Sequence, residues 1–276
     1  MQFKRQQSSK IDKTPEHSAK GEILGCHAFP AAGIGGTDSL VLNINDHIIS
    51  ITTEGRNDKT RDHIFGYKRL LGKEIVAEKL LTSVTEEVTL CILPVPPLYA
   101  LQNICNHLCL KFKSPIVVDQ DQKLDFYTKM PIEIGIFKQS HKKGLLLIDC
   151  ISLCKQQYTL YGTPESGVIC RYKETEISAT EVETSKFEEA SLSARLLNET
   201  NKIIELSKLV IPLSTIVVDY SNDNSYLSSI VEIKVGTSFG KDIANVEMVS
   251  AKIWDSESST IRSKENVLTF LMDKGF

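Results

Sequence analysis

The stretch from Asp125 to Tyr172 constrains the fold of this chain more than any other part of its sequence. Short apolar runs alternate there with turn residues, as in LLLIDCISL after Lys142–Gly144 and VICRY after TPESG. Runs of this length and alternation are typical of half-buried strands. The pattern recurs in both halves of the chain without the helix–strand alternation that indicates a parallel sheet. We therefore predict a mainly β fold made of two β-sandwich-like domains with few short helices.

The predicted domain boundaries follow changes in composition along the chain. Residues 1–20 are polar and lack hydrophobic periodicity, which is typical of a disordered tail. We expect an N-terminal β domain over residues 21–175 and a C-terminal β-sandwich domain over residues 188–256. The acidic stretch 173–190 is expected to connect them. The last residues, 257–276, are expected to form a tail or a short helix.

Four segments carry specific local predictions. Alternation over Ser39–Thr53 predicts a hairpin that turns near Asn45–Asp46. Lys73–Leu81 fits either a strand or one short helix. Leu192–Leu197 and Ile203–Leu209 contain helix-favouring residues, but the neighbouring β-branched runs favour strands.

Composition and charge narrow the class of protein. The chain is 41% hydrophobic and 24% charged, as in ordinary soluble globular proteins. Its net charge of −3 gives no general attraction to nucleic acid, and we expect no nucleic-acid partner. No apolar run reaches the roughly 18 residues of a membrane-spanning helix, so no transmembrane segment is expected. The first residues lack the apolar core of a secretory signal, and a cytoplasmic location is therefore predicted.

The cysteines support the same location. Their number is odd and their spacing does not suggest a compact disulfide framework; they are Cys26, Cys91, Cys105, Cys109, Cys150, Cys154 and Cys170. Most of them lie within apolar runs, where a free cysteine behaves as a small hydrophobic residue. We therefore predict free, buried thiols in a reducing compartment.

Several motifs in the central part of the chain resemble a known family. They are PVPP at 94–97, KMPIEIGIF at 129–137, IDCISLCKQQYTLYG at 148–162 and GVICRY at 167–172. Together they resemble the archaeal domain-of-unknown-function family numbered 432, over a span from about Ile64 to about Val235. The resemblance implies an archaeal source and a cytoplasmic protein. It implies no reaction, because that family brings no catalytic residues to carry over.

Charged residues within apolar runs form the first candidate site. Glu133 lies in PIEIGIF, Asp149 follows LLLI, and Arg171 follows VIC. A buried charge is costly unless it is paired, so these positions mark either a register-fixing ion pair or a polar ligand pocket. Arg171 can bridge carboxylates through its planar fork. Tyr161 lies in the same family-like motifs, and it completes this candidate ligand-binding set.

The second candidate site is a metal site at Cys105, His107 and Cys109. Alternate residues on a strand point to one face, so the three soft ligands align there. Their spacing along one strand lets two of them share an ion but hardly all three. The simpler interpretation is core cysteines with a satisfied histidine, and no metal or other cofactor is expected.

No set of residues in the sequence composes a reaction. We therefore predict a non-enzymatic interaction or ligand-sensing module that acts on a protein partner or a small ligand through sheet edges and loops. The alternative is a small-molecule-binding protein or enzyme with a polar pocket built on Glu133, Asp149 and Arg171.

Overall fold

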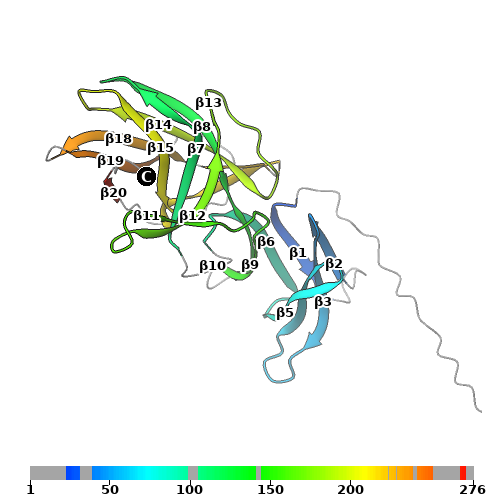
Figure 1. Cartoon of the computed structure of the whole chain (residues 1–276). Coiled ribbons are helices and arrows are strands. Elements are labelled where there is room, and N and C mark those ends of the chain that lie inside the picture. Colours follow the sequence, from blue (N-terminus) through cyan, green and yellow to red (C-terminus); the bar gives the residue numbers. More distant parts are fainter. Residues whose placement is uncertain are drawn as a thin grey trace, which may run out of the picture. The chain divides into compact units, whose positions relative to one another are not determined.

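The computed structural model describes residues 23–31, 39–98, 105–140, 144–222, 224–227, 229–238, 241–250 and 268–271. Its elements are strands apart from one 3-10 turn, η1 (Leu213–Thr215), which confirms the prediction of a mainly β fold (Figure 1). In these ranges no helix has the length and apolar character needed to cross a lipid bilayer.

The chain divides into two compact units. One contains Phe29–Glu87, and the other contains Glu22–Ala28 together with Val88–Phe276. The acidic stretch 173–190 lies within the second unit. The tail predicted for residues 1–20 lies outside the described residues, as does the predicted C-terminal tail apart from Leu268–Leu271.

The first unit contains an antiparallel sheet in the order β2-β3-β4-β5. Its strands are β2 (Ser39–Ile44), β3 (His47–Arg56), β4 (His63–Leu71) and β5 (Glu74–Ser83). The predicted hairpin is confirmed, and Asn45 at its turn adopts a φ of 49°, which asparagine tolerates well. Of the two alternatives for Lys73–Leu81, the strand is confirmed: from Glu74 onward the segment belongs to β5 and pairs with β4. The core of this sheet consists of Ile44, Ile49, Ile51, Phe65 and Tyr67.

Most of a second sheet, in the order β1-β6-β9-β10, belongs to the second unit. Its strands are β1 (Gly25–Pro30), β6 (Glu87–Val95), β9 (Glu133–Ser140) and β10 (Gly144–Ile151). The apolar runs TLCILPV and IEIGIF make β6 and β9 the buried centre of this sheet. A bulge after Leu147 places Asp149 opposite Ile136 and Cys150 opposite Gly135.

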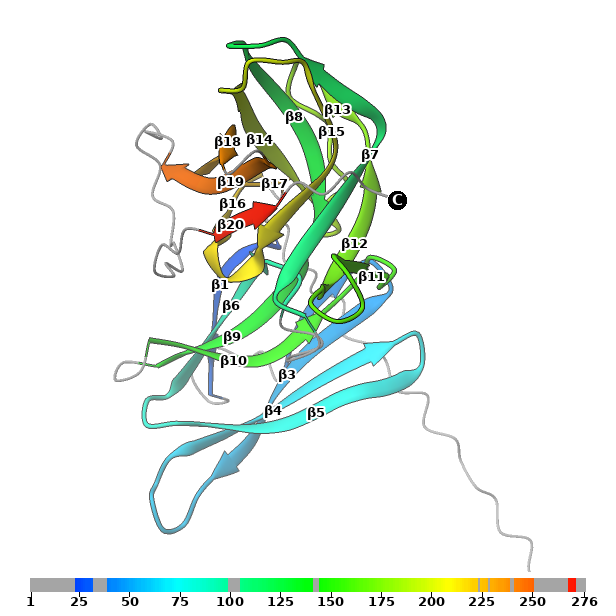
Figure 2. The same cartoon turned by 60° about the vertical axis from the view of Figure 1, so that its left-hand side comes forward.

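The third sheet carries the candidate site. It has the order β11-β12-β7-β15, formed by β11 (Tyr158–Tyr161), β12 (Val168–Thr175), β7 (His107–Val118) and β15 (Ile204–Pro212). β12 runs parallel to β7, and the other two pairings are antiparallel. Figure 2 shows β11 and β12 as a short hairpin beside the long β7.

The eight-stranded fourth sheet completes the second unit. Its main path is β13-β8-β14-β18-β19-β20, and β16 and β17 join it at β14. These strands are β13 (Ile177–Ser178), β8 (Lys123–Pro131), β14 (Glu189–Asn198), β18 (Ser229–Ser238), β19 (Lys241–Ser250), β20 (Leu268–Leu271), β16 (Val218–Ser221) and β17 (Asn224–Leu227). The strands expected at Leu192–Leu197 and Ile203–Leu209 correspond to β14 and β15.

A buried asparagine holds the connection between β14 and β15. The Asn198 amide donates hydrogen bonds to the carbonyls of Val118, Asp119 and Lys202 at 3.1, 2.9 and 2.8 Å. Its oxygen accepts hydrogen bonds from the backbone N–H and the hydroxyl of Thr200 at 3.0 and 2.6 Å. The side chain therefore replaces the backbone pairing that is lost where the chain turns.

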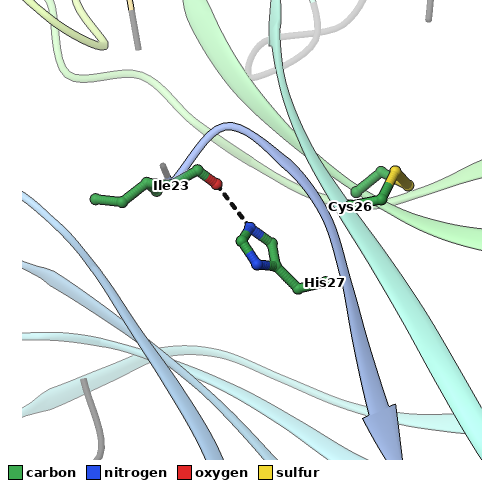
Figure 3. Close-up of a disulfide and its surroundings, with 4 residues drawn as sticks. Ile23, Cys26 and His27 are labelled. Atoms are coloured by element: carbon green, nitrogen blue, oxygen red, sulfur yellow. Dashed lines mark hydrogen bonds between the residues drawn. A yellow bond between two sulfur atoms is a disulfide. The ribbon is translucent and has the colours of Figure 1, made fainter. Parts of the chain in front are cut away.

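The structure corrects the prediction that every cysteine is free. Cys26 on β1 and Cys91 on β6 form a disulfide across neighbouring strands (Figure 3). The two cysteines are 65 residues apart, so their spacing in the sequence did not reveal the pairing. Figure 3 also shows the His27 ring turned to the carbonyl of Ile23, at 2.8 Å. The disulfide joins the segments that precede and follow the first unit.

Candidate functional site

Arg171 on β12 is the most unusual side chain of the described residues, because it carries a full positive charge and the residue is only 2% exposed. Its guanidinium donates long hydrogen bonds to the hydroxyls of Tyr158 and Ser152, at 3.5 and 3.4 Å. The Tyr158 ring centre lies 5.7 Å from the guanidinium carbon. Among the described residues, no carboxylate lies within 4.0 Å of this guanidinium. A buried cation whose hydrogen-bond partners are neutral hydroxyls is costly, and such a cost points to a functional role.

The β11–β12 hairpin determines which residue meets Arg171. Gly162 has a φ of 100°, and a Cβ there would lie 2.9 Å from the Cα of Gly167. The backbone N–H of Gly167 also bonds the carbonyl of Thr163, at 2.6 Å. This close turn sets the register in which Tyr158 lies directly opposite Arg171.

A single row of side chains crosses the whole sheet through Arg171. The register places Tyr158 opposite Arg171, Arg171 opposite Leu108, and Leu108 opposite Ile211. Opposed residues share one face of a sheet. Along this row Tyr158 is 38% exposed, whereas Leu108 and Ile211 are fully buried. Arg171 therefore lies where this face of the sheet passes from the interior to the surface.

Glu133 and two cysteines lie in the same neighbourhood. Glu133 begins β9 and is buried, and the Cys150 thiol donates to its Oε2 at 3.6 Å. Both Glu133 and Arg171 act electrostatically on the Cys105 thiol, which also receives a backbone hydrogen bond from Arg171. Glu133 and Arg171, both predicted as ligand-binding residues, therefore lie within electrostatic range of one cysteine.

Burial favours the protonated form of three thiols of this region, Cys105, Cys154 and Cys170. Burial raises the pKa of Cys105, against the lowering effects of the Arg171 backbone and charge. Burial also raises the pKa of Cys154, whose thiol donates to the carbonyl of Glu188 at 3.0 Å. The pKa of Cys170 rises to about 12, through burial and then through its cysteine neighbours. A protonated thiol is a poor nucleophile and a poor metal ligand.

The other two predicted ligand-binding residues lie elsewhere. Asp149 is opposite Ile136, on the face of its sheet away from Glu133, and its Oδ1 accepts the backbone N–H of Cys150 at 2.8 Å. Tyr161 is opposite Val168, on the face away from Arg171. There it packs against the buried cluster of Cys109, Cys170 and Val210.

The three candidate metal ligands take separate environments. Cys109 belongs to the same buried cluster as Cys170. Burial lowers the pKa of His107, which favours the neutral imidazole. Within the described part of the chain, no group of three or more His, Cys, Asp or Glu side chains is arranged to hold a metal ion.

Two residues that surround Arg171 were missed by the choice of site residues from the sequence. They are Tyr158, which covers the guanidinium, and Ser152, which follows β10. Strand alternation could have indicated Tyr158, because Tyr158 and Tyr161 point to opposite faces of the same short strand and only one of them can face Arg171. No signal of this kind exists for Ser152, whose position depends on how two sheets pack together.

Comparisons with known proteins identify the family of the chain without identifying an activity. No curated protein and no solved structure matches it. Residues 40–273 match a family described as a protein of unknown function, DUF432. This match spans most of the sequence, well beyond the motifs around Arg171. The chain belongs to the DUF432 family.

Proposed function

We propose that this protein is a non-enzymatic ligand-sensing module that binds a small anionic molecule at Arg171. The observation that carries the proposal is the burial of this guanidinium among neutral hydroxyls. An anion that reached it would supply the charge-assisted hydrogen bonds that offset the cost of desolvation.

The geometry of arginine favours a small oxyanion as the ligand. The guanidinium offers five N–H donors in a planar fork, and this fork suits two oxygens of one anion. The described hydrogen bonds of the Arg171 side chain are two long ones, at 3.4 and 3.5 Å. Bonds of this length are weaker than the charge-assisted bonds of 2.7–2.9 Å that arginine makes to oxyanions. Replacing these two bonds by bonds to an anion is therefore electrostatically favourable for the Arg171 guanidinium.

The electrostatics of the neighbouring groups favour binding over covalent chemistry. Two thiols on which the Arg171 charge acts, Cys105 and Cys154, have raised pKa values, chiefly because of burial. Neither is activated as a nucleophile in the way that catalytic cysteines are. An enzyme with a polar pocket on Glu133, Asp149 and Arg171 remains the alternative, and turnover that depends on Glu133 would favour it.

A cytoplasmic location belongs to the same proposal. Cys26 and Cys91 do not support this location, because they form a disulfide and disulfides are rare in most cytoplasmic proteins. The location rests instead on the family resemblance and on the five cysteines that stay free.

The test is a thermal-shift titration of the full chain with small carboxylates and with inorganic phosphate. A ligand that binds only the folded state raises the melting temperature with its concentration. We expect such a rise for the wild type and for Arg195→Met, a control that removes an exposed arginine paired with Asp125. Arg171→Met should show no rise. An equal rise in Arg171→Met, or no rise with any anion, would contradict the proposal.

We also propose a second candidate function, a protein contact at the edge strand β5. It pairs with β4 and lies at the edge of its sheet, and no other described strand pairs with it. An edge strand of this kind can accept an added strand. The strand carries exposed apolar side chains, including Leu80, which is 73% exposed. Strand addition uses such an edge to bind an extended peptide with apolar residues at alternate positions.

A peptide-display selection tests this second candidate. Extended peptides captured by the wild type should be lost in Leu80→Lys and kept in Val117→Lys, which changes an exposed valine on β7. Peptides retained equally by both variants would rule out β5 as the contact strand.

A further inference from the structure

We propose that the anion at Arg171 is a carboxylate with an apolar tail, and that the tail lies on an apolar shelf formed by Leu160 and Ile169. This inference rests on the proposed function and names its ligand class. The shelf adjoins the buried cation on one face of the β11–β12 hairpin, so that one molecule can contact both.

The strand register places the shelf beside the cation. Leu160 lies directly opposite Ile169, just as Tyr158 lies opposite Arg171. Each shelf residue is two positions from its neighbour in the row through Arg171, so both pairs project from the same face. Two residues along a strand span about 6.6 to 6.8 Å. A ligand whose carboxylate meets Arg171 therefore has its first methylenes within reach of the shelf.

The shelf continues the face of the sheet that carries Arg171, and about half of its surface is exposed in the described structure. Leu160 is 46% exposed and Ile169 is 52% exposed, while Leu108 and Ile211 on the same face are fully buried. The ladder between β12 and β7 begins at Cys170, so Ile169 projects beyond the end of that pairing. Apolar surface next to a buried charge is the arrangement expected for an amphiphilic ligand.

Local charge favours a carboxylate over a phosphate. Glu133 is buried in the same neighbourhood and acts with Arg171 on Cys105. A second negative charge on the ligand adds repulsion from Glu133, which a singly charged carboxylate reduces. The hydroxyls of Tyr158 and Ser152 already lie beside the guanidinium, where they can donate to carboxylate oxygens.

Tyr158 controls access to the site. It begins the four-residue strand β11, and its ring stands over the guanidinium. The carboxylate reaches Arg171 when this ring turns aside, and the ring can then pack on the bound tail. Entry therefore requires the movement of one partly exposed side chain at a strand end and leaves the hairpin intact.

The test is a series of straight-chain acids of increasing length: acetate, butyrate, hexanoate and octanoate. Each is titrated into the full chain, labelled at its leucine and isoleucine methyl groups and followed by NMR. We expect shifts at Leu160 and Ile169, and a dissociation constant that falls roughly two- to fourfold per methylene added. Hexylamine, with the same tail and the opposite charge, should not shift these methyls.

Three variants separate the parts of the claim. Leu160→Asn should remove the dependence on tail length while acetate binds as before, and Val117→Asn, a control on the far part of β7, should keep it. Arg171→Met should lose every acid in the series. Binding independent of tail length, or saturable binding of phosphate alone, would overturn the shelf and leave the anion site intact. Failure of every acid and of phosphate would overturn both proposals.

Discussion

Tyr158 and Arg171 lie directly opposite one another on β11 and β12, with the tyrosine ring 5.7 Å from the guanidinium carbon. The ring takes the place of a carboxylate as the cover of a buried cation. It shields the charge from water and attracts it through the electrons of the ring face. Because β11 is short, the tyrosine that covers the cation lies at the end of a strand.

The Tyr158 ring, rather than its hydroxyl, should account for the stability of this pair. The hydroxyl accepts a long hydrogen bond of 3.5 Å, so Tyr158→Phe should change the free energy of unfolding by less than about 0.5 kcal/mol. Tyr158→Ala removes the ring and should cost about 1 kcal/mol. Urea unfolding of both variants measures the difference. Equal losses in the two variants would mean that the ring contributes nothing.

Reduction of the disulfide should destabilise the protein. Cys26 and Cys91 close a loop with a sequence separation of 65, and opening such a loop costs about 4 kcal/mol in the chain-entropy view. Urea unfolding with and without a reducing agent should show this loss in the wild type. The variant Cys26→Ser should already be weakened and should not respond to the reducing agent.

Alkylation of the unfolded chain counts the thiols directly. Without reduction, five cysteines should react, and all seven should react after reduction. Labelling of all seven without reduction, in protein taken rapidly from cells, would show that the bond is absent there.

Acid should weaken the protein partly through Glu189. Burial raises the pKa of this carboxyl, but the hydrogen bond and charge of Lys173, at 2.9 Å, and further partners outweigh it, so the net pKa is lowered. A carboxyl with a lowered folded pKa contributes stability above its unfolded pKa, near 4.3, and loses it as the pH falls through the folded value.

The variant Glu189→Gln should test that contribution. At pH 7 it should be less stable than the wild type by about 1 kcal/mol, and the gap should close below about pH 4. Urea unfolding at several pH values measures the gap. A difference that stays constant as the pH falls would exclude the charge of Glu189 as its cause.

Replacing Asn198 by alanine should be among the most damaging single changes. It removes two accepted hydrogen bonds and the contacts that the two amide hydrogens share among three carbonyls. The buried groups left without partners should cost roughly 3 kcal/mol. Asn222→Ala, at an exposed turn asparagine, serves as the control and should cost much less. Similar melting temperatures for the two variants would contradict this view.

The sequence predicted the strands better than the partners of the charged residues. Alternation and turn residues revealed the hairpin at Asn45–Asp46 and favoured strands in the second half, because those signals are local. Arg171 stood out for a local reason as well, since a charge inside an apolar run is conspicuous. Its partners were not predictable in the same way, because they depend on how strands and sheets meet.

Three particular differences show where local reasoning ends. The motifs in the sequence indicate Tyr161, whereas the structure places Tyr158 at Arg171. The register that decides between them depends on the close turn between Gly162 and Gly167. Asp149 was grouped with Glu133, but a bulge places it on the other face. The disulfide needed strand order, which links residues far apart in the sequence.

The most direct test of the central claim is the dissociation constant of hexanoate for the wild type and for Arg171→Met, measured by calorimetric titration on folded protein. We expect saturable binding at one site in the wild type and none in Arg171→Met, with Arg195→Met unchanged. Equal binding by the wild type and Arg171→Met would contradict it, and Arg171 would then be a structural cation rather than the centre of a ligand site.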